Sequence, residues 1–169
     1  PIHILWVNLI TDTFPALALG MEPEEKNVMN KPPRDPKSAI FEKPLLFRLG
    51  YQGLMIAVLT LSAFLIGQKT SVALGQTMAF TVLSGTQIFH SFNLRSNVYS
   101  LFSKGPGNKW LFLAGGVSLL LQLIVLFVPF LRDIFRLVPM TPAQWLMVSG
   151  FCVAPILIVE LFKALGWTG

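Results

Sequence analysis

Charged residues and cysteines are what this sequence has least of. Asp, Glu, Lys and Arg make up 12% of its 169 residues, against about 25% in a soluble domain, which excludes an ordinary water-soluble globular fold. The single cysteine, Cys152, excludes a disulfide framework and a zinc–thiolate cluster. The net charge of +5 comes without basic residues interleaved with aromatic ones, so a nucleic-acid-binding module is not predicted either.

Long apolar runs take the place of the missing charge. A run without charge of about 20 residues is long enough to cross a hydrocarbon core as a helix, whereas barrel strands are about 10 residues long and alternate strictly. The sequence therefore predicts an all-α, polytopic membrane protein with a bundle of five transmembrane helices. The predicted spans, joined after the first by a polar loop at 22–44, are 2–21, 45–67, 71–93, 109–131 and 141–163.

Lysine and arginine are distributed unevenly between the two sides that alternating spans define. Of the 13 such residues, ten lie on the side of loop 22–44, and the other three are Lys69, Arg132 and Arg136. Cytoplasmic loops carry the excess of positive charge. We therefore predict that loop 22–44 and the C-terminus are cytoplasmic, and that the first span enters from outside.

Three oxygen-bearing side chains interrupt the first apolar stretch. Asn8, Thr11 and Asp12 stand at i, i+3 and i+4, on one face of a regular helix. A carboxylate in a membrane span marks an ion or proton pathway, and mixed carboxylate, amide and hydroxyl oxygens suit a hard cation such as calcium. Pro15 has no N–H, so the carbonyl of Thr11 loses its helical donor. These features predict a cation site; the alternative is a structural Asp12 bonded to a neighbouring helix.

A second polar set lies in the third predicted span, where Ser84, Gln87, His90 and Ser91 recur at helical spacing. Such side chains commonly hydrogen-bond between helices in membranes, and that is our interpretation of His90. Gln87 is the most central of the four and the one that could reach an ion.

Two stretches resemble a known family. The run LWVNLITDTFPALALGMEPEEKNVMNKPPR closely resembles the sixth transmembrane helix and following loop of calcium-transporting P-type ATPases, and TMAFTVLSGTQIFHSFNLRS is similar to their eighth. The resemblance covers essentially the whole chain, 1–169, and implies a C-terminal transmembrane domain with helices six to ten. It also implies that Asn8 and Asp12 are ligands of the transported calcium, and that Thr11 lies at a position that ligates in pumps with two sites.

Two positions that differ from relatives bear on the transported ion. Pumps that carry two calcium ions have a glutamate where this chain has Gln87, and a neutral amide does not offset the charge of a second ion. This looks like the one-calcium arrangement of plasma-membrane and secretory-pathway relatives. Sodium–potassium pumps resemble the first helix but carry aspartate at the position of Asn8. The amide therefore favours calcium, or manganese as in secretory-pathway types.

The resemblance implies the ion-binding membrane half of an ATP-driven calcium exporter, a translocase in the plasma membrane. Mg²⁺ and ATP would act only in cytoplasmic domains outside this sequence, and this chain alone would not hydrolyse ATP. The expected partners are the phosphorylation domain, through loop 22–44, the remaining membrane helices and the lipid bilayer. The alternative from another class is a non-enzymatic channel or accessory subunit that uses Asp12 as a pore or assembly residue.

Overall fold

The computed structural model describes residues 2–21, 43–93 and 109–164, so nearly all of loop 22–44 lies outside the described residues. Within these ranges the regular structure is entirely helical, which confirms the all-α prediction. The elements are α1 (Ile2–Trp6), η1 (Val7–Asp12), α2 (Thr13–Gly20), α3 (Lys43–Gln68), α4 (Val72–Asn93), α5 (Lys109–Phe127), α6 (Pro129–Ile134) and α7 (Pro142–Ala164).

In the described part of the chain, four helical stretches are long and apolar enough to cross a membrane: Ile2–Gly20, Leu45–Gln68, Lys109–Phe127 and Pro142–Leu161. They make this a multi-pass membrane protein. The predicted span 71–93 is also a helix, the 22-residue α4, but it is more polar than the other four. Its position explains the difference, because a helix covered by other helices can carry polar side chains that a lipid-facing helix cannot.

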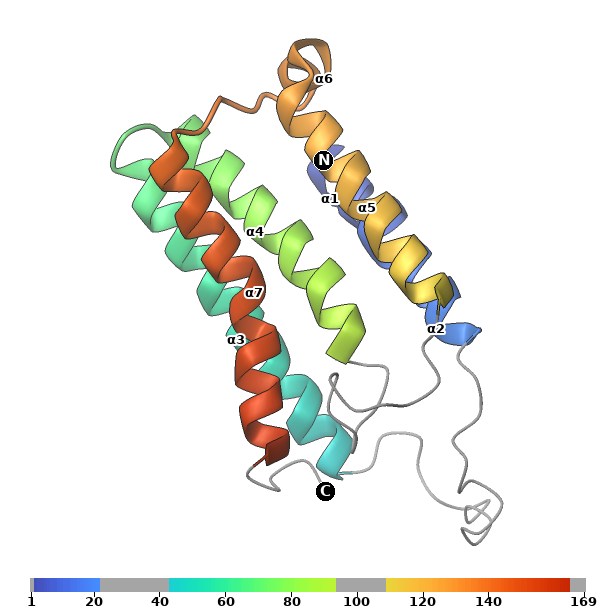
Figure 1. Cartoon of the computed structure of the whole chain (residues 1–169). Helices are drawn as coiled ribbons and strands as arrows, with labels where there is room; N and C mark the ends of the chain where they lie inside the picture. The colour runs from blue at the N-terminus through green and yellow to red at the C-terminus, as the bar shows by residue number, and fades with distance from the viewer. Residues whose placement is uncertain (1, 22–42, 94–108, 165–169) are drawn as a thin grey trace, which may run out of the picture.

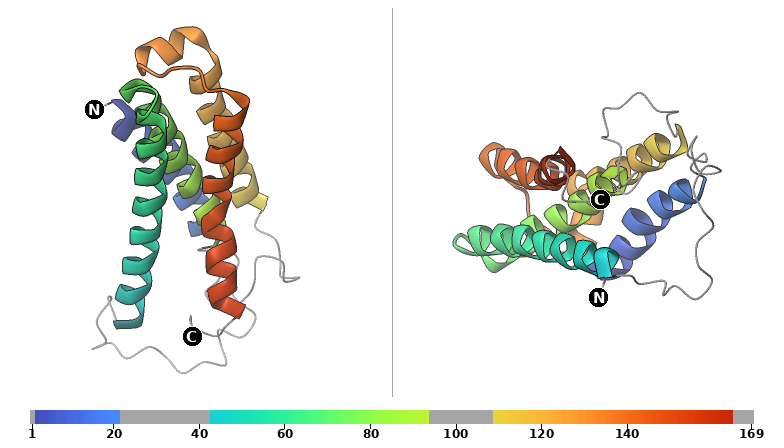
Figure 2. Two further views of the ribbon diagram at one scale, coloured as in Figure 1. Left: turned by 90° about the vertical axis from the view of Figure 1, so that its left-hand side faces the viewer. Right: turned by 90° about the horizontal axis from the view of Figure 1, so that it is seen from below.

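Helix α4 occupies the middle of the bundle (Figures 1 and 2). It packs against α3 and α7 on one side and against η1, α2 and α5 on the other. Threonines and serines of α4 at 77, 81, 84, 86 and 91 are buried. Several of them satisfy their hydroxyls on carbonyls of the same helix, such as Thr77 on Ala73 at 2.9 Å and Thr81 on Thr77 at 2.8 Å. The polar side chains that lower the hydropathy of α4 therefore face the interior of the bundle.

The hairpin of α3 and α4 depends on two glycines that let the helix backbones meet. A Cβ at Gly75 would lie 2.8 Å from the Phe64 carbonyl oxygen and 3.0 Å from the Gln68 nitrogen. A Cβ at Gly67 would lie 2.7 Å from Cα of Gly75. Small residues permit such close approach between membrane helices. Gly116 of α5, in contrast, has no atom within 4 Å of the place of a Cβ.

We expect Gly75→Ala to destabilise the protein by about 1–3 kcal/mol, because the added methyl overpacks against rigid backbone. Gly116→Ala is the matched control, and it should be neutral or stabilising by up to about 1 kcal/mol through helix propensity. Thermal inactivation of the full-length protein that contains this chain, purified in detergent, measures both. Equal stability of the two variants would contradict the close packing of α3 on α4.

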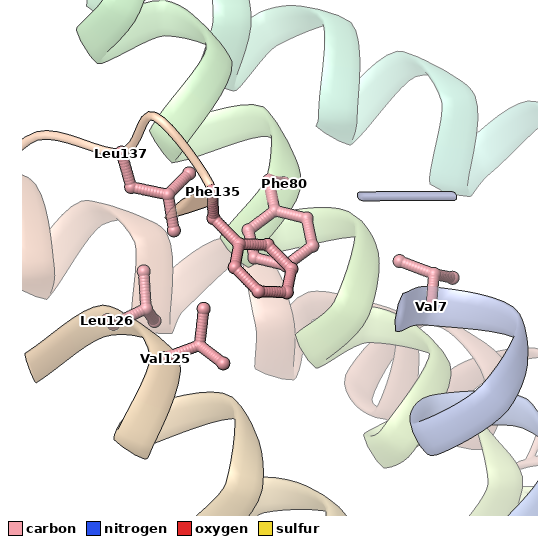
Figure 3. Close-up of a cluster of buried hydrophobic side chains, with 6 residues drawn as sticks. All are labelled: Val7, Phe80, Val125, Leu126, Phe135 and Leu137. Atoms are coloured by element: carbon pink, nitrogen blue, oxygen red, sulfur yellow. The ribbon is translucent and has the colours of Figure 1, made fainter. Parts of the chain in front are cut away.

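At the end of the bundle that holds α6, a buried cluster joins the first helix to α4, to α5 and to the segment that follows α6 (Figure 3). Its members are Val7, Phe80, Val125, Leu126, Phe135 and Leu137. His3 packs its ring against Phe80 with 4.9 Å between centroids, and its Nε2 lies 2.8 Å from the Phe135 carbonyl oxygen. The first helix is therefore anchored at its start as well as along its length.

Prolines end and restart the helices around α6. Val128 is extended (φ −76°, ψ 116°) because it precedes Pro129, and a residue before proline is pushed out of the α region. Helix α5 therefore ends at Phe127 rather than at 131, and Pro129 begins α6, where its missing N–H costs nothing. Thr141 and Gln144 exchange bonds in a capping box that starts α7.

Candidate cation site

The first membrane helix changes its winding where the polar residues stand. Val7–Asp12 forms η1, a π-helical turn between α1 and α2. Such wide turns are rare and occur frequently at functional sites. The prediction placed Asn8, Thr11 and Asp12 on one face of a regular helix. In the structure Thr11 is buried at 1% exposure, Asp12 is half-buried and Asn8 is exposed. The wider turn thus directs Thr11 inward and leaves Asn8 on the uncovered side.

Thr11 connects η1 to α4 by contacting Gln87, the other predicted site residue. Its Oγ1 lies 2.7 Å from the Val7 carbonyl oxygen and 3.1 Å from Gln87 Oε1. A hydroxyl has one hydrogen, which cannot point at both acceptors. The two ends of a carboxamide have nearly the same shape, so a Gln87 amide turned over would donate Nε2 to Thr11 and direct its oxygen elsewhere. In either orientation the two side chains are paired.

Asn8 and Asp12 lie on a part of the first helix that α4 and α5 leave open. Their neighbours Leu5 and Leu9 are 66% and 57% exposed. The main-chain carbonyl of Asn8 is taken by the Thr13 hydroxyl at 2.8 Å. The side-chain amide of Asn8 and the Asp12 carboxylate are the oxygen donors presented on this side.

The remaining polar residues predicted in the third span line the interior of α4. Ser91 is buried and donates to the Ile88 carbonyl oxygen at 2.6 Å. His90 is also buried. Ser84 is fully buried, and its Oγ has no hydrogen-bond partner among the described residues. Of the interactions described for this set, the hydrogen bond of Gln87 with Thr11 is the one that reaches the first helix.

Two polar residues of α5 also lie against the first helix around η1, and they are not among the site residues predicted from the sequence. Ser118 donates its hydroxyl to the Ile10 carbonyl oxygen at 2.8 Å, and Gln122 accepts the Trp6 indole N–H at 3.0 Å. Both are buried, at 0% and 2% exposure. Their spacing of i and i+4 in an otherwise apolar run was the signal available in the sequence.

The donor chemistry around η1 is that of a hard-cation site. It consists of carboxylate, amide and hydroxyl oxygens, the ligands that calcium prefers. Within 2–21, 43–93 and 109–164 no three His, Cys, Asp or Glu side chains gather into a metal-binding group. Calcium takes about six to eight oxygens, so the described residues around η1 would not complete such a site by themselves.

Comparison with known proteins decides the family. Residues 1–165 match the family described as cation transporting ATPase, C-terminus. The chain belongs to this family. Calcium-transporting ATPase 1 of Bacillus cereus is 39% identical over 182 residues, which cover 96% of this chain and 20% of that protein. The calcium-transporting ATPase of Bacillus subtilis is 41% identical over 164 residues, 94% of this chain and 18% of its own length.

A more distant relative has the same coverage. Calcium-transporting ATPase 1 of Lactococcus lactis is 34% identical over 170 residues, which cover 97% of this chain and 19% of that protein. The chain thus spans about one fifth of the length of the curated relatives it matches. As a member of the cation-transporting ATPase family, it corresponds to the C-terminal membrane region. The resemblance noted in the sequence is confirmed.

Proposed function

We propose that this chain is the ion-binding membrane half of an ATP-driven calcium pump, in which Asn8 and Asp12 coordinate one transported Ca²⁺. The observation that carries the proposal is the wide turn η1, which presents the Asp12 carboxylate and the Asn8 amide on an uncovered side while Thr11 pairs with Gln87 of α4. A carboxylate held in a membrane helix beside a disrupted turn is what an ion pathway requires. The names of the similar proteins support calcium as the ion.

The number of ions follows from the charge near η1. Asp12 is the only acidic residue of the first membrane helix. The α4 residue that contacts the adjacent Thr11 is Gln87, which is neutral. Two calcium ions bring four positive charges into a low-dielectric site, and unpaired charges there are costly. The Thr11 hydroxyl is already engaged by Val7 and Gln87, so we assign it a weaker part. We therefore propose a single-ion site, completed by ligands from helices outside this chain.

The whole pump would supply the remaining parts. Mg²⁺ and ATP would act in cytoplasmic domains that loop 22–44 contacts, and the energy of ATP would reach η1 through that contact and through the other membrane helices. We place the protein in the plasma membrane, and the positive-inside argument puts its C-terminus in the cytoplasm. Membership of an ATPase family favours this pump over a channel or accessory subunit.

Equilibrium binding of radioactive calcium to the purified full-length pump tests the proposal. We expect one ion per phosphorylatable site and a Hill coefficient of about one, because a single site cannot be cooperative. Two bound ions per site would contradict the single-ion assignment. Manganese serves as the competitor. If manganese displaces bound calcium at a concentration below that of the calcium present, manganese is the preferred ion. The absence of saturable binding of either ion would contradict the site itself.

A further inference from the structure

Three carbonyls around η1 are bound by hydroxyl groups. The Val7 carbonyl accepts from Thr11 at 2.7 Å, the Asn8 carbonyl from Thr13 at 2.8 Å and the Ile10 carbonyl from Ser118 at 2.8 Å. The first two hydroxyls belong to the first membrane helix itself, so they would move with it if η1 changed to a regular α-helical turn. The third belongs to α5, so it fixes the turn relative to the rest of the bundle.

The carbonyl that Ser118 binds would lack a donor from its own helix in the wide-turn register. In the i→i+5 register of a π-helix, the donor to the Ile10 carbonyl would be Pro15, which has no N–H. Ser118 is fully buried and therefore cannot exchange this bond for one with water. Ile10 is half-buried, and a carbonyl shielded from water without a donor is costly, so the Ser118 hydroxyl favours the wide turn over a regular helix at this point.

Gln122 holds the same helix one turn away. It lies four residues after Ser118 on α5, and its Oε1 accepts from the indole of Trp6, the last residue of α1. The two bonds fix the first helix at two places: at Trp6, just before η1, and at Ile10, within η1. With both fixed, the segment that carries Asn8 and Asp12 cannot slide or rotate along α5 without breaking a partly buried hydrogen bond.

We propose that Ser118 is a positioning residue of the cation site, which holds η1 in its wide-turn form through the Ile10 carbonyl and so sets the directions of Asn8 and Asp12. Gln122 assists by fixing Trp6. We give neither side chain a ligand role in this arrangement, because the Ser118 hydroxyl and the Gln122 oxygen are both directed at the first helix. The inference rests on the proposed function, since it concerns the same ion site.

The test compares Ser118→Ala with Ser91→Ala in the full-length pump, by titrating calcium-dependent phosphorylation from ATP. Ser91 is also a buried serine, but its hydroxyl serves a carbonyl of its own helix. We expect Ser118→Ala to raise the calcium concentration for half-maximal phosphorylation about three- to tenfold, the value of one hydrogen bond. The maximal phosphoenzyme level, and phosphorylation from inorganic phosphate without calcium, should stay unchanged. Ser118→Thr keeps the hydroxyl and should restore most of the calcium affinity.

Hydrogen–deuterium exchange gives a readout that needs no ion. Amides of residues 11–14 should exchange faster in Ser118→Ala, and not in Ser91→Ala, because η1 loses its anchor to α5. A lowered phosphoenzyme maximum with an unchanged half-maximal calcium concentration would show a purely structural Ser118 and overturn the inference.

Asp12→Asn, measured in parallel, separates the two claims. If Asp12→Asn loses calcium activation while Ser118→Ala behaves as wild type in both assays, the inference fails and the proposed function stands. If Asp12→Asn keeps wild-type calcium activation, the proposed function fails, and the positioning role falls with it.

Discussion

Replacing Asp12 by asparagine is expected to abolish calcium-activated phosphorylation from ATP in the full-length pump. The change keeps the shape of the side chain but removes the only carboxylate of the first membrane helix. Removing one partner of a buried charge pair costs about 3–5 kcal/mol, which corresponds to a loss of more than about 100-fold in calcium affinity. Phosphorylation from inorganic phosphate should survive, because it requires no bound calcium.

Asp133→Asn is the matched control for this experiment. Asp133 is an exposed residue of the short helix α6, so the same isosteric exchange is made away from η1. Its calcium dependence should equal that of the wild type. An Asp12→Asn pump with unchanged calcium affinity would contradict the assignment of Asp12 as a ligand, whatever the control shows.

The helices themselves could be predicted because their causes are local. Charge-free runs of about 20 residues indicate the helices α3, α5 and α7, and prolines stand where α6 and α7 begin. The end of α5 was placed four residues late because the apolar run continues past Val128, although the residue before Pro129 must leave the helix. Hydropathy and backbone sterics predict different ends for α5, and the observed end is the one that backbone sterics predict.

The candidate site could be predicted in its residues but not in its geometry. Asn8, Thr11 and Asp12 stood out by their chemistry, whereas their common face assumed 3.6 residues per turn throughout. The wide turn η1 breaks that period, and the bonds that accompany it reach residues 76 and 108 positions away in the chain. In the sequence Ser118 and Gln122 are an ordinary polar pair. Their partners, the Ile10 carbonyl and the Trp6 indole, are known only from the fold.

The environment of α4 is another feature that could not be predicted from the sequence. Its serines and threonines make it the least apolar of the long helices, and composition alone does not show whether it faces lipid. Its central place, with neighbours on both sides, resolves the matter. Burial in protein replaces burial in lipid for this helix, and several of its polar side chains find partners on its own backbone or on the first helix.

The orientation of the bundle leads to the last expected result, an all-or-none pattern of cysteine labelling. The turn between α3 and α4 and the short helix α6 lie at the same end of the bundle (Figure 1). Lys69, Arg132 and Arg136 belong to this end, against ten basic residues predicted for the other. By the positive-inside rule this end faces outward. In a background without the buried Cys152, Thr70→Cys and Asp133→Cys should both react with a membrane-impermeant maleimide added to intact cells.

Ser38→Cys, in the predicted cytoplasmic loop, completes the set and should react only after the cells are permeabilised. Thr70 and Asp133 are exposed, so a failure to react would report sidedness and not burial. Labelling of Ser38→Cys alone in intact cells would reverse the orientation. Labelling of Thr70→Cys and Asp133→Cys from opposite sides would contradict the arrangement of the helices itself, because one end of a membrane-spanning bundle cannot face both solutions. Reaction of all three only after permeabilisation would place the pump in an internal membrane and leave its helix arrangement intact.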